Sequence, residues 1–266
     1  MVRRSGSGQL IPNYKANVRD ADNSILGVVS DRYQVVQNCD AFLFTDELLG
    51  VGVKYETAGS LQGGRRIWLL AKLPERYIIS GENVEPFLVF SNSHDGSAAI
   101  NVAMTPVRIV CQNTLNLALK QAKRTWSSRH IGNIQGKLHE AQETLELAHG
   151  YMNELGREID SLSRIRMSDA KVISYINELV PTPDNATDIQ KRNVSQIRDD
   201  MLTRYFEAPD LKLLDKNGYR FINAISDHAT HSQPIRTTAN YRENLFMKTL
   251  DGHTVIDRAH AMLKAA

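Results

Sequence analysis

The chain has 266 residues, of which 42% are hydrophobic and 23% charged, and these values are ordinary for a globular protein. No apolar run approaches the ~18 residues of a membrane-spanning helix, and the N-terminus lacks the apolar segment of a signal peptide, so we expect a cytoplasmic protein with no membrane partner. The formal net charge is only +2, and by itself this value excludes no class of partner.

The only two cysteines are Cys39 and Cys111. Two cysteines are too few for a four-cysteine zinc site. In a chain without a leader segment we expect both thiols to be reduced and buried, and a disulfide between them is the alternative.

The first half of the sequence predicts an antiparallel sheet. Short β-branched segments at 14–20 and 25–30 flank a turn cluster. Apolar residues at helical spacing in 38–49 predict a short helix that ends at Gly50. Residues 51–61 and 65–73 predict a β-hairpin around a Gln-Gly-Gly turn.

A second hairpin is predicted around Asp95-Gly96, because both residues tolerate the positive φ angles of a tight turn. Its strands are residues 85–93 and 98–110. Residues 111–124 then predict a helix with leucines on its apolar side.

The second half of the sequence predicts helices. Apolar residues from Ile134 to Leu162 alternate at spacings of four and three through about four heptads, which predicts one long helix with a coiled-coil-like seam. The seam could pack within the chain or form a subunit contact. Capping residues at Ser168 and Thr187 predict two further helices, and two short helices are expected at 219–229 and 255–266.

These elements predict an α+β fold, with an antiparallel-rich sheet and short helices in the N-terminal half. The C-terminal half is predicted to be helical and to contain the one long heptad-patterned helix. We predict a flexible N-terminal tail over 1–10, an α+β sheet domain over 11–128, and a helical region over 129–266 that packs on it.

Three stretches carry a resemblance to a known family: "LGVVSDRYQVVQNCDAFLF", "TAGSLQGGRRIWLLAKLP" and "SNSHDGSAAINVAMTPVRIVCQNTLNLAL". The sequence resembles the phage/plasmid-like protein family, a domain of unknown function found on phages, prophages and conjugative plasmids. The resemblance extends from about Ile11 to "INAISDHATH". It implies an association with DNA transactions, in a setting similar to that of phage single-strand annealing proteins, and it implies no catalytic residues.

Charge is distributed unevenly along the chain. No acidic residue occurs between Asp95 and Glu140, whereas that window contains several cations and Trp126. A groove of cations binds the nucleic-acid backbone through counterion release, and an aromatic ring there can stack on a base. The alternatives are the solvated last turn of a helix and a tryptophan in the core. The candidate nucleic-acid-binding residues are Arg65, Arg66, Arg108, Lys120, Lys123, Arg124, Trp126, Arg129 and His130.

The sequence offers no catalytic constellation, and we expect no cofactor and no metal. His94 and Asp95 suggest a metal or catalytic site, but adjacent strand residues point to opposite faces, so a polar turn is the preferred interpretation. His228 and His231 lie three residues apart on a predicted helix, where a polar pair is preferred over a metal site. No phosphate-binding loop or nucleophile elbow is present.

Two hypotheses for the function follow. The first is a non-enzymatic protein of a mobile element that binds nucleic acid, with single-stranded DNA favoured, in recombination or replication, and that forms a homo-oligomer. The second is a protein-interaction or anti-defence factor that acts on a host complex through its helical half.

Overall fold

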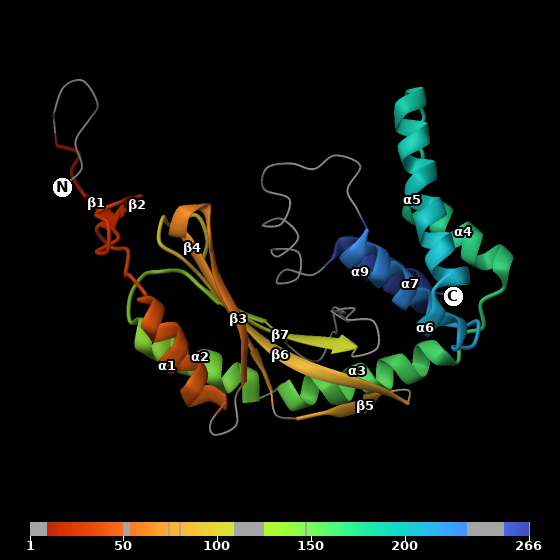
Figure 1. The fold of residues 1–266 in the computed structure, drawn as a ribbon, viewed down its shortest axis with the longest axis horizontal. Coiled ribbons are helices and arrows are strands. Elements are labelled where there is room, and N and C mark those ends of the chain that lie inside the picture. Colours follow the sequence, from red (N-terminus) through yellow and green to blue (C-terminus); the bar gives the residue numbers. More distant parts are fainter. Residues whose placement is uncertain are drawn as a thin grey trace. The chain divides into compact units, whose positions relative to one another are not determined.

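A computed structural model describes residues 10–49, 54–73, 75–79, 81–108, 125–146, 148–232 and 253–265 (Figure 1). Contacts between residues divide the chain into two compact units that are not continuous in sequence. We call the first the sheet unit, which comprises Met1–Glu75, Pro86–Met104 and Lys123–Ala148. The second is the helical unit, which comprises Arg76–Glu85, Thr105–Ala122 and His149–Ala266.

The main sheet has six strands, and its order is β3-β4-β6-β7-β8, with β5 paired to β6. The pairs β3–β4, β4–β6, β5–β6 and β7–β8 are antiparallel. Together with the helices below, this confirms the predicted α+β class. The strands are β3 (Lys54–Leu61), β4 (Arg66–Lys72), β5 (Tyr77–Ile79), β6 (Glu82–Ser93), β7 (Ile100–Arg108) and β8 (Thr125–Ser128).

Both predicted hairpins are present. Strands β3 and β4 are joined by the short 3-10 turn η1 (Gln62–Gly64), where Gly63 and Gly64 have φ angles of 70° and 95° that favour glycine. Strands β6 and β7 are neighbours on either side of Gly96, whose φ is 73°. A separate two-stranded antiparallel sheet is formed by β1 (Tyr14–Val18) and β2 (Ile25–Ser30).

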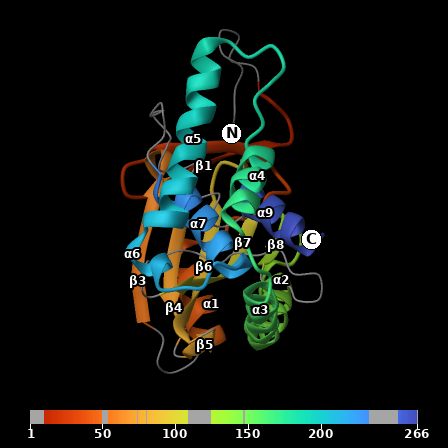
Figure 2. The same ribbon diagram turned by 90° about the vertical axis from the view of Figure 1, so that its right-hand side faces the viewer.

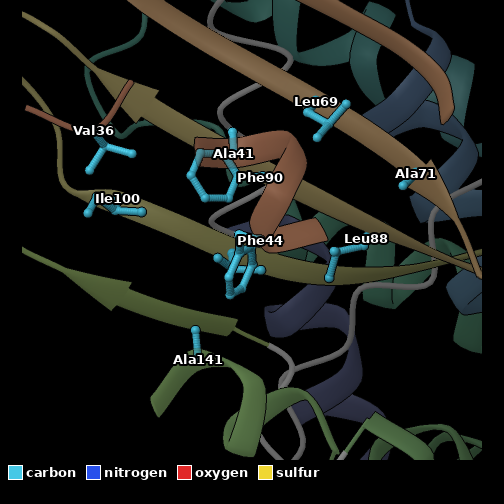
Figure 3. Close-up of a cluster of buried hydrophobic side chains, with 10 residues drawn as sticks. Val36, Ala41, Phe44, Leu69, Ala71, Leu88, Phe90, Ile100 and Ala141 are labelled. Atoms are coloured by element: carbon cyan, nitrogen blue, oxygen red, sulfur yellow. The ribbon is translucent and has the colours of Figure 1, made fainter. Parts of the chain in front are cut away.

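Helices α1 (Asn38–Leu49) and α2 (Ile134–Glu146) contribute to one core with the sheet. Figure 3 shows this cluster, in which Phe44 of α1 lies near Phe90 of β6 and Ala141 projects from α2. The two phenylalanine rings are 5.8 Å apart between centroids. The cluster comprises Val36, Ala41, Phe44, Leu69, Ala71, Leu88, Phe90, Ile100, Val102 and Ala141.

The expectation that both cysteines are buried is wrong for Cys39, whose side chain is exposed. Cys39 lies in the first turn of α1, whose buried residues Ala41, Phe44 and Thr45 occupy the side that faces the sheet. Position 39 therefore falls on the other side of the helix. Cys111 lies outside the described residues.

The helical unit is built around α7 (Gly218–His231), which is buried along most of its length and packs against α5 (Asp188–Glu207) and α9 (Thr254–Lys264). Figure 2 shows the long helix α5 beside α4 (Asp169–Leu179), and these two helices are also in contact. The other helices described in this half are α3 (Ala148–Ser163) and α6 (Pro209–Lys212).

The capping predictions are confirmed. Ser168 caps α4 by accepting a hydrogen bond from the backbone N–H of Lys171 at 3.2 Å. Thr187 and Gln190 form a reciprocal capping box at the start of α5. These local signals fix where both helices begin.

The heptad pattern falls on two described helices, α2 and α3, and residue 147 between them lies outside the described residues. Ala141 packs into the sheet core, and Met152, Leu155, Ile159 and Leu162 are all buried in α3. These positions of the heptad pattern therefore pack against other residues of the same chain. Whether one continuous helix spans the pattern stays a prediction, as does the helix over 111–124, which lies outside the described residues.

Within the described part of the chain, the helices are all too short or too polar to cross a membrane.

Candidate nucleic-acid interface

Strand β4 has two chemically different faces. Its residues Leu69 and Ala71 are buried in the core below α1. Successive side chains of a strand alternate between faces, so Arg66, Trp68, Leu70 and Lys72 belong to the opposite face, and all four are half-buried. This second face of β4 therefore carries a cation at each end, Arg66 and Lys72, with two apolar residues between them.

Trp68 lies directly over the neighbouring edge strand. It pairs with Gly59 of β3, and a Cβ added at Gly59 would be 2.9 Å from indole Cε2 and Nε1. No real side chain at position 59 tolerates that separation. The glycine therefore lets the indole lie across β3, and the aromatic ring in turn covers a glycine that contributes no side chain to the sheet.

Three of the predicted arginines reach the same end of the sheet. Arg66 pairs with Ser93 where β4 begins and β6 ends, and Arg65 directly precedes Arg66. Ile100 pairs with Ser128 where β7 begins and β8 ends, and Arg129 directly follows Ser128. Strands β4 and β8 are separated by three strand spacings, or roughly 14 Å at about 4.8 Å each.

Two of these arginines have unengaged guanidinium groups. Arg65 and Arg129 are exposed, and among the described residues neither side chain has a hydrogen-bond or ion-pair partner. Arg66 Nε donates to Ser97 Oγ at 3.3 Å. This end of the sheet therefore carries positive charge that internal carboxylates do not neutralise.

The β1–β2 hairpin is fixed to the same end of the sheet. Asn17 Nδ2 donates to the carbonyl of His94 at 2.7 Å, and Arg19 donates to the carbonyl of Gly63 at 3.1 Å. Arg19 also forms a salt bridge with Asp22, so its charge is locally balanced. We therefore leave Arg19 out of the candidate interface.

The other two described candidates, Trp126 and His130, point inward. Trp126 of β8 pairs with the buried Val102 and packs against the sheet core. His130 is 4% exposed, stacks on Tyr33, and approaches the carbonyl of Gln34 with Nδ1 at 3.1 Å. His130 is therefore buried, whereas Trp126 is only partly buried and packs on the core face of the sheet, opposite the face of Trp68.

Burial shapes the electrostatics around these residues. It lowers the pKa of His130 below the usual histidine value, although the hydrogen bond to Gln34 opposes the shift. It likewise lowers the pKa of His94, which is 6% exposed. Burial also raises the pKa of Tyr33 to about 12.

The side chains of four predicted cations lie outside the described part of the structure. Lys120, Lys123 and Arg124 lie outside the described residues. Arg108 is the last residue of β7, and its side chain is outside the described part of the structure. Their role in nucleic-acid binding stays a prediction.

The remaining polar motifs have structural partners. His94 Nε2 lies 2.9 Å from Asn38 Oδ1, and Asp95 accepts a hydrogen bond from the N–H of Ser97, as in a polar turn. On α7, His228 bonds Asp200 and His231 bonds Asp227. Over the ranges that the structure describes, no three His, Cys, Asp or Glu residues are placed to hold a metal ion.

Trp68 was missed by the sequence reasoning. Two features of the sequence indicate this residue: the side chains of "RRIWLLAK" alternate between the two faces of a strand, and the facing strand "TAGSL" contains a glycine. An aromatic residue opposite a glycine, flanked by cations two and four residues away, indicates a sheet surface with both charge and a stacking ring.

The sheet unit and the helices after it define an α+β protein with a candidate polyanion surface. The family model described as a domain of unknown function, DUF932, matches residues 25–249, and the chain therefore belongs to this family. Comparisons with curated proteins and with solved structures gave no match.

Proposed function

We propose that this chain binds single-stranded nucleic acid, with DNA favoured, at the end of the sheet where β4 begins and β8 ends. It acts without catalysing a reaction, as a homo-oligomer, in the recombination or replication machinery of a mobile element. The mobile-element setting rests on the resemblance of its sequence motifs to the phage/plasmid-like family.

One observation carries the proposal: Arg65, Arg66 and Arg129 lie at the same end of the sheet, and Trp68 lies on β4 two residues from Arg66. Cations bind the phosphate backbone of any sequence by releasing counterions. An aromatic ring on the same surface adds stacking on a base, which tolerates every base and needs an unpaired strand. The combination favours a single strand over a duplex.

The first test measures the salt dependence of binding. A fluorescent oligo-dT is titrated with the full chain at 50 and 200 mM salt, beside the triple variant Arg65→Gln/Arg66→Gln/Arg129→Gln. Each phosphate contact to a single strand contributes a slope of about −0.7 in log K against log salt, so losing three contacts reduces the slope by about 2. A charge-matched control replaces Arg157, Lys171 and Arg192 of the helical unit by Gln, and its slope should equal that of the wild type. Equal slopes for all three proteins would refute the proposed surface.

The second test asks which tryptophan meets the bases. The chain has two tryptophans, so Trp126→Phe leaves only the emission of Trp68, and Trp68→Phe leaves only that of Trp126. We expect oligo-dT to quench Trp68 and to leave Trp126 unchanged. Quenching of Trp126 alone would move the site to the opposite face of the sheet and contradict the proposed surface.

A third variant, Lys120→Ala/Lys123→Ala/Arg124→Ala, tests the predicted cations outside the described residues. Weaker binding in this variant would extend the surface along residues 96–139, the segment that contains no acidic residue. Light scattering on the same samples measures the oligomeric state, and a monomer both with and without DNA would contradict the homo-oligomer.

A further inference from the structure

The helical unit contains a second cationic feature, a cavity of about 800 Å³ where α3 ends and where α4 and α7 begin. Its volume falls in the range of small-molecule sites, about 300–1,000 Å³. Three cations and one carboxylate are among the lining residues, so the wall has a net positive charge. These four are Arg164, Arg166, Lys216 and Asp215.

Two of the three cations are uncommitted. Arg164 and Arg166 are exposed, and within the described ranges neither guanidinium has a hydrogen-bond or ion-pair partner. Lys216 is held by Asp169 at 2.7 Å. The two guanidinium groups therefore line one cavity without an internal anion, although carboxylates are the usual partners of arginine.

The backbone holds this wall in a defined shape. Met167 N–H donates to the carbonyl of Lys216, and Gly218 N–H donates to the carbonyl of Ile165, both at 2.9 Å. A Cβ at Gly218 would lie 2.9 Å from the carbonyl oxygen of Leu162. Glycine at 218 therefore permits the close approach of the two segments.

This pairing also brings two helix starts to the same cavity. The N-cap residues Ser168 of α4 and Asn217 of α7 both line it. The positive end of a helix dipole adds to the potential that attracts an anion. The dipoles only reinforce the two unengaged arginines, which carry the argument.

We propose that this cavity binds the phosphate group of a phosphorylated ligand. The planar fork of arginine matches phosphate oxygens in bidentate geometry, and two such groups in one wall suit an anion with several acceptor oxygens. The cavity is larger than a phosphate ion and has room for an attached group. The phosphate belongs either to a small nucleotide or to a nucleic-acid backbone. This site lies in the helical unit and does not rest on the function proposed for the sheet unit.

The test uses the full chain and three probes at constant ionic strength: inorganic phosphate, adenosine monophosphate, and oligo-dT without a terminal phosphate. Binding is measured by calorimetry for the wild type, for Arg164→Gln/Arg166→Gln, and for the control Arg157→Gln/Arg192→Gln, which removes two exposed arginines elsewhere in the unit. Circular dichroism verifies that each variant is folded, which we expect because both replaced side chains are exposed and unpaired.

We expect adenosine monophosphate to bind the wild type and the control equally, and at least tenfold more weakly to the cavity variant. The same loss for oligo-dT alone would assign the site to a nucleic-acid backbone phosphate. If the cavity variant binds all three probes as the wild type does, or if no probe binds the wild type, the proposed site is wrong. Because Arg65, Arg66 and Arg129 are intact in this variant, its result is independent of the sheet-surface test.

Discussion

The imidazole of His130 lies flat on the phenol ring of Tyr33, with ring centroids 4.5 Å apart and an angle of 14° between the planes. Its Nδ1 is 3.1 Å from the carbonyl of Gln34, whereas Nε2 is buried without a hydrogen-bond partner among the described residues. Lys137 and His94 are close enough to lower its pKa further. The site therefore accepts a neutral histidine and disfavours a charged one.

This arrangement predicts that acid destabilises the sheet unit. Burial lowers the folded-state pKa of both His130 and His94, so the unfolded chain binds more protons as the pH falls below about 6.5. The free energy of unfolding should be constant above that pH, decrease as pH falls through it, and level off below the folded-state values. Urea unfolding between pH 7.5 and 5 measures this dependence.

The double variant His94→Gln/His130→Gln is the control for that experiment. It has a lower stability at pH 7.5, because stacking and hydrogen bonds are lost, but its stability should vary less between pH 7.5 and 5. Most carboxylates titrate below this range and therefore contribute little to the comparison. An unchanged pH dependence in the variant would show that other groups are responsible.

The sequence predicted those features whose causes are local. The helix starts at Ser168 and Thr187 follow from side chains that bond the backbone three residues away. The turn at Gly63 follows from glycine's tolerance of positive φ. Both kinds of signal are complete within a few residues, so no knowledge of the tertiary structure is needed to recognise them.

The candidate site could be predicted only in part, because strand order is not a local property. Arg65 and Arg129 are 64 positions apart, and they lie at the same end of one sheet only because β4, β6, β7 and β8 are neighbours in that order. His130 lies in a polar, acid-free stretch that indicates a surface, yet its ring is buried by Tyr33. The face occupied by Trp126 likewise depends on its pairing with Val102.

A second prediction concerns the contact between Gly59 and Trp68. Replacement of Gly59 by Val places a side chain where the indole lies, at a Cβ separation of 2.9 Å. Because the ring must move or the strands must separate, we expect a loss of about 1–3 kcal/mol of stability. Chemical denaturation measures this loss, and the emission of Trp68 in the Trp126→Phe background should shift with it.

The neighbouring residue Ala58 supplies the control for that variant. Ala58 is exposed on the same strand, so Ala58→Val should change stability by no more than about 0.5 kcal/mol. Equal losses of stability in the two variants would mean that a valine anywhere in this edge strand is destabilising, and that the contact with the indole is not the cause.

A third prediction concerns the buried cation Arg220 of α7. Its guanidinium donates to the carbonyl of Tyr205 from Nε at 2.9 Å and from Nη2 at 2.6 Å, and to the carbonyl of Leu214 at 3.1 Å. Tyr205 lies in the last turn of α5, where carbonyls lack partners within the helix. Arg220 therefore connects the ends of two segments to α7.

Replacement of Arg220 by Met removes these bonds and leaves both carbonyls unsatisfied. Hydrogen bonds to charged groups contribute about 1.5–3 kcal/mol, so we expect a loss of at least about 2 kcal/mol in the free energy of unfolding. Arg220→Lys should not restore it, because a single ammonium group lacks the fork that reaches two carbonyls. Denaturation of Arg192→Met, an exposed position on α5, should differ from the wild type by less than about 0.5 kcal/mol. If Arg220→Lys were as stable as the wild type, a positive charge at this position would be sufficient for stability without the bonds of the guanidinium fork.

The last prediction concerns the first turn of α5. Thr187 Oγ1 accepts the N–H of Gln190 at 3.3 Å, and Gln190 Oε1 accepts the N–H of Thr187 at 2.8 Å. Thr187→Ala should destabilise this helix end by about 1 kcal/mol, whereas Thr187→Ser retains the hydroxyl acceptor and should cost much less. The residues that follow, Asp188 to Arg192, are exposed, so little tertiary packing holds this end of the helix. Hydrogen exchange should therefore show faster exchange over the first turns of α5 in the Ala variant, with protection of the buried helix α7 unchanged. Faster exchange throughout α7 would instead mean that α5 and α7 unfold as one cooperative unit.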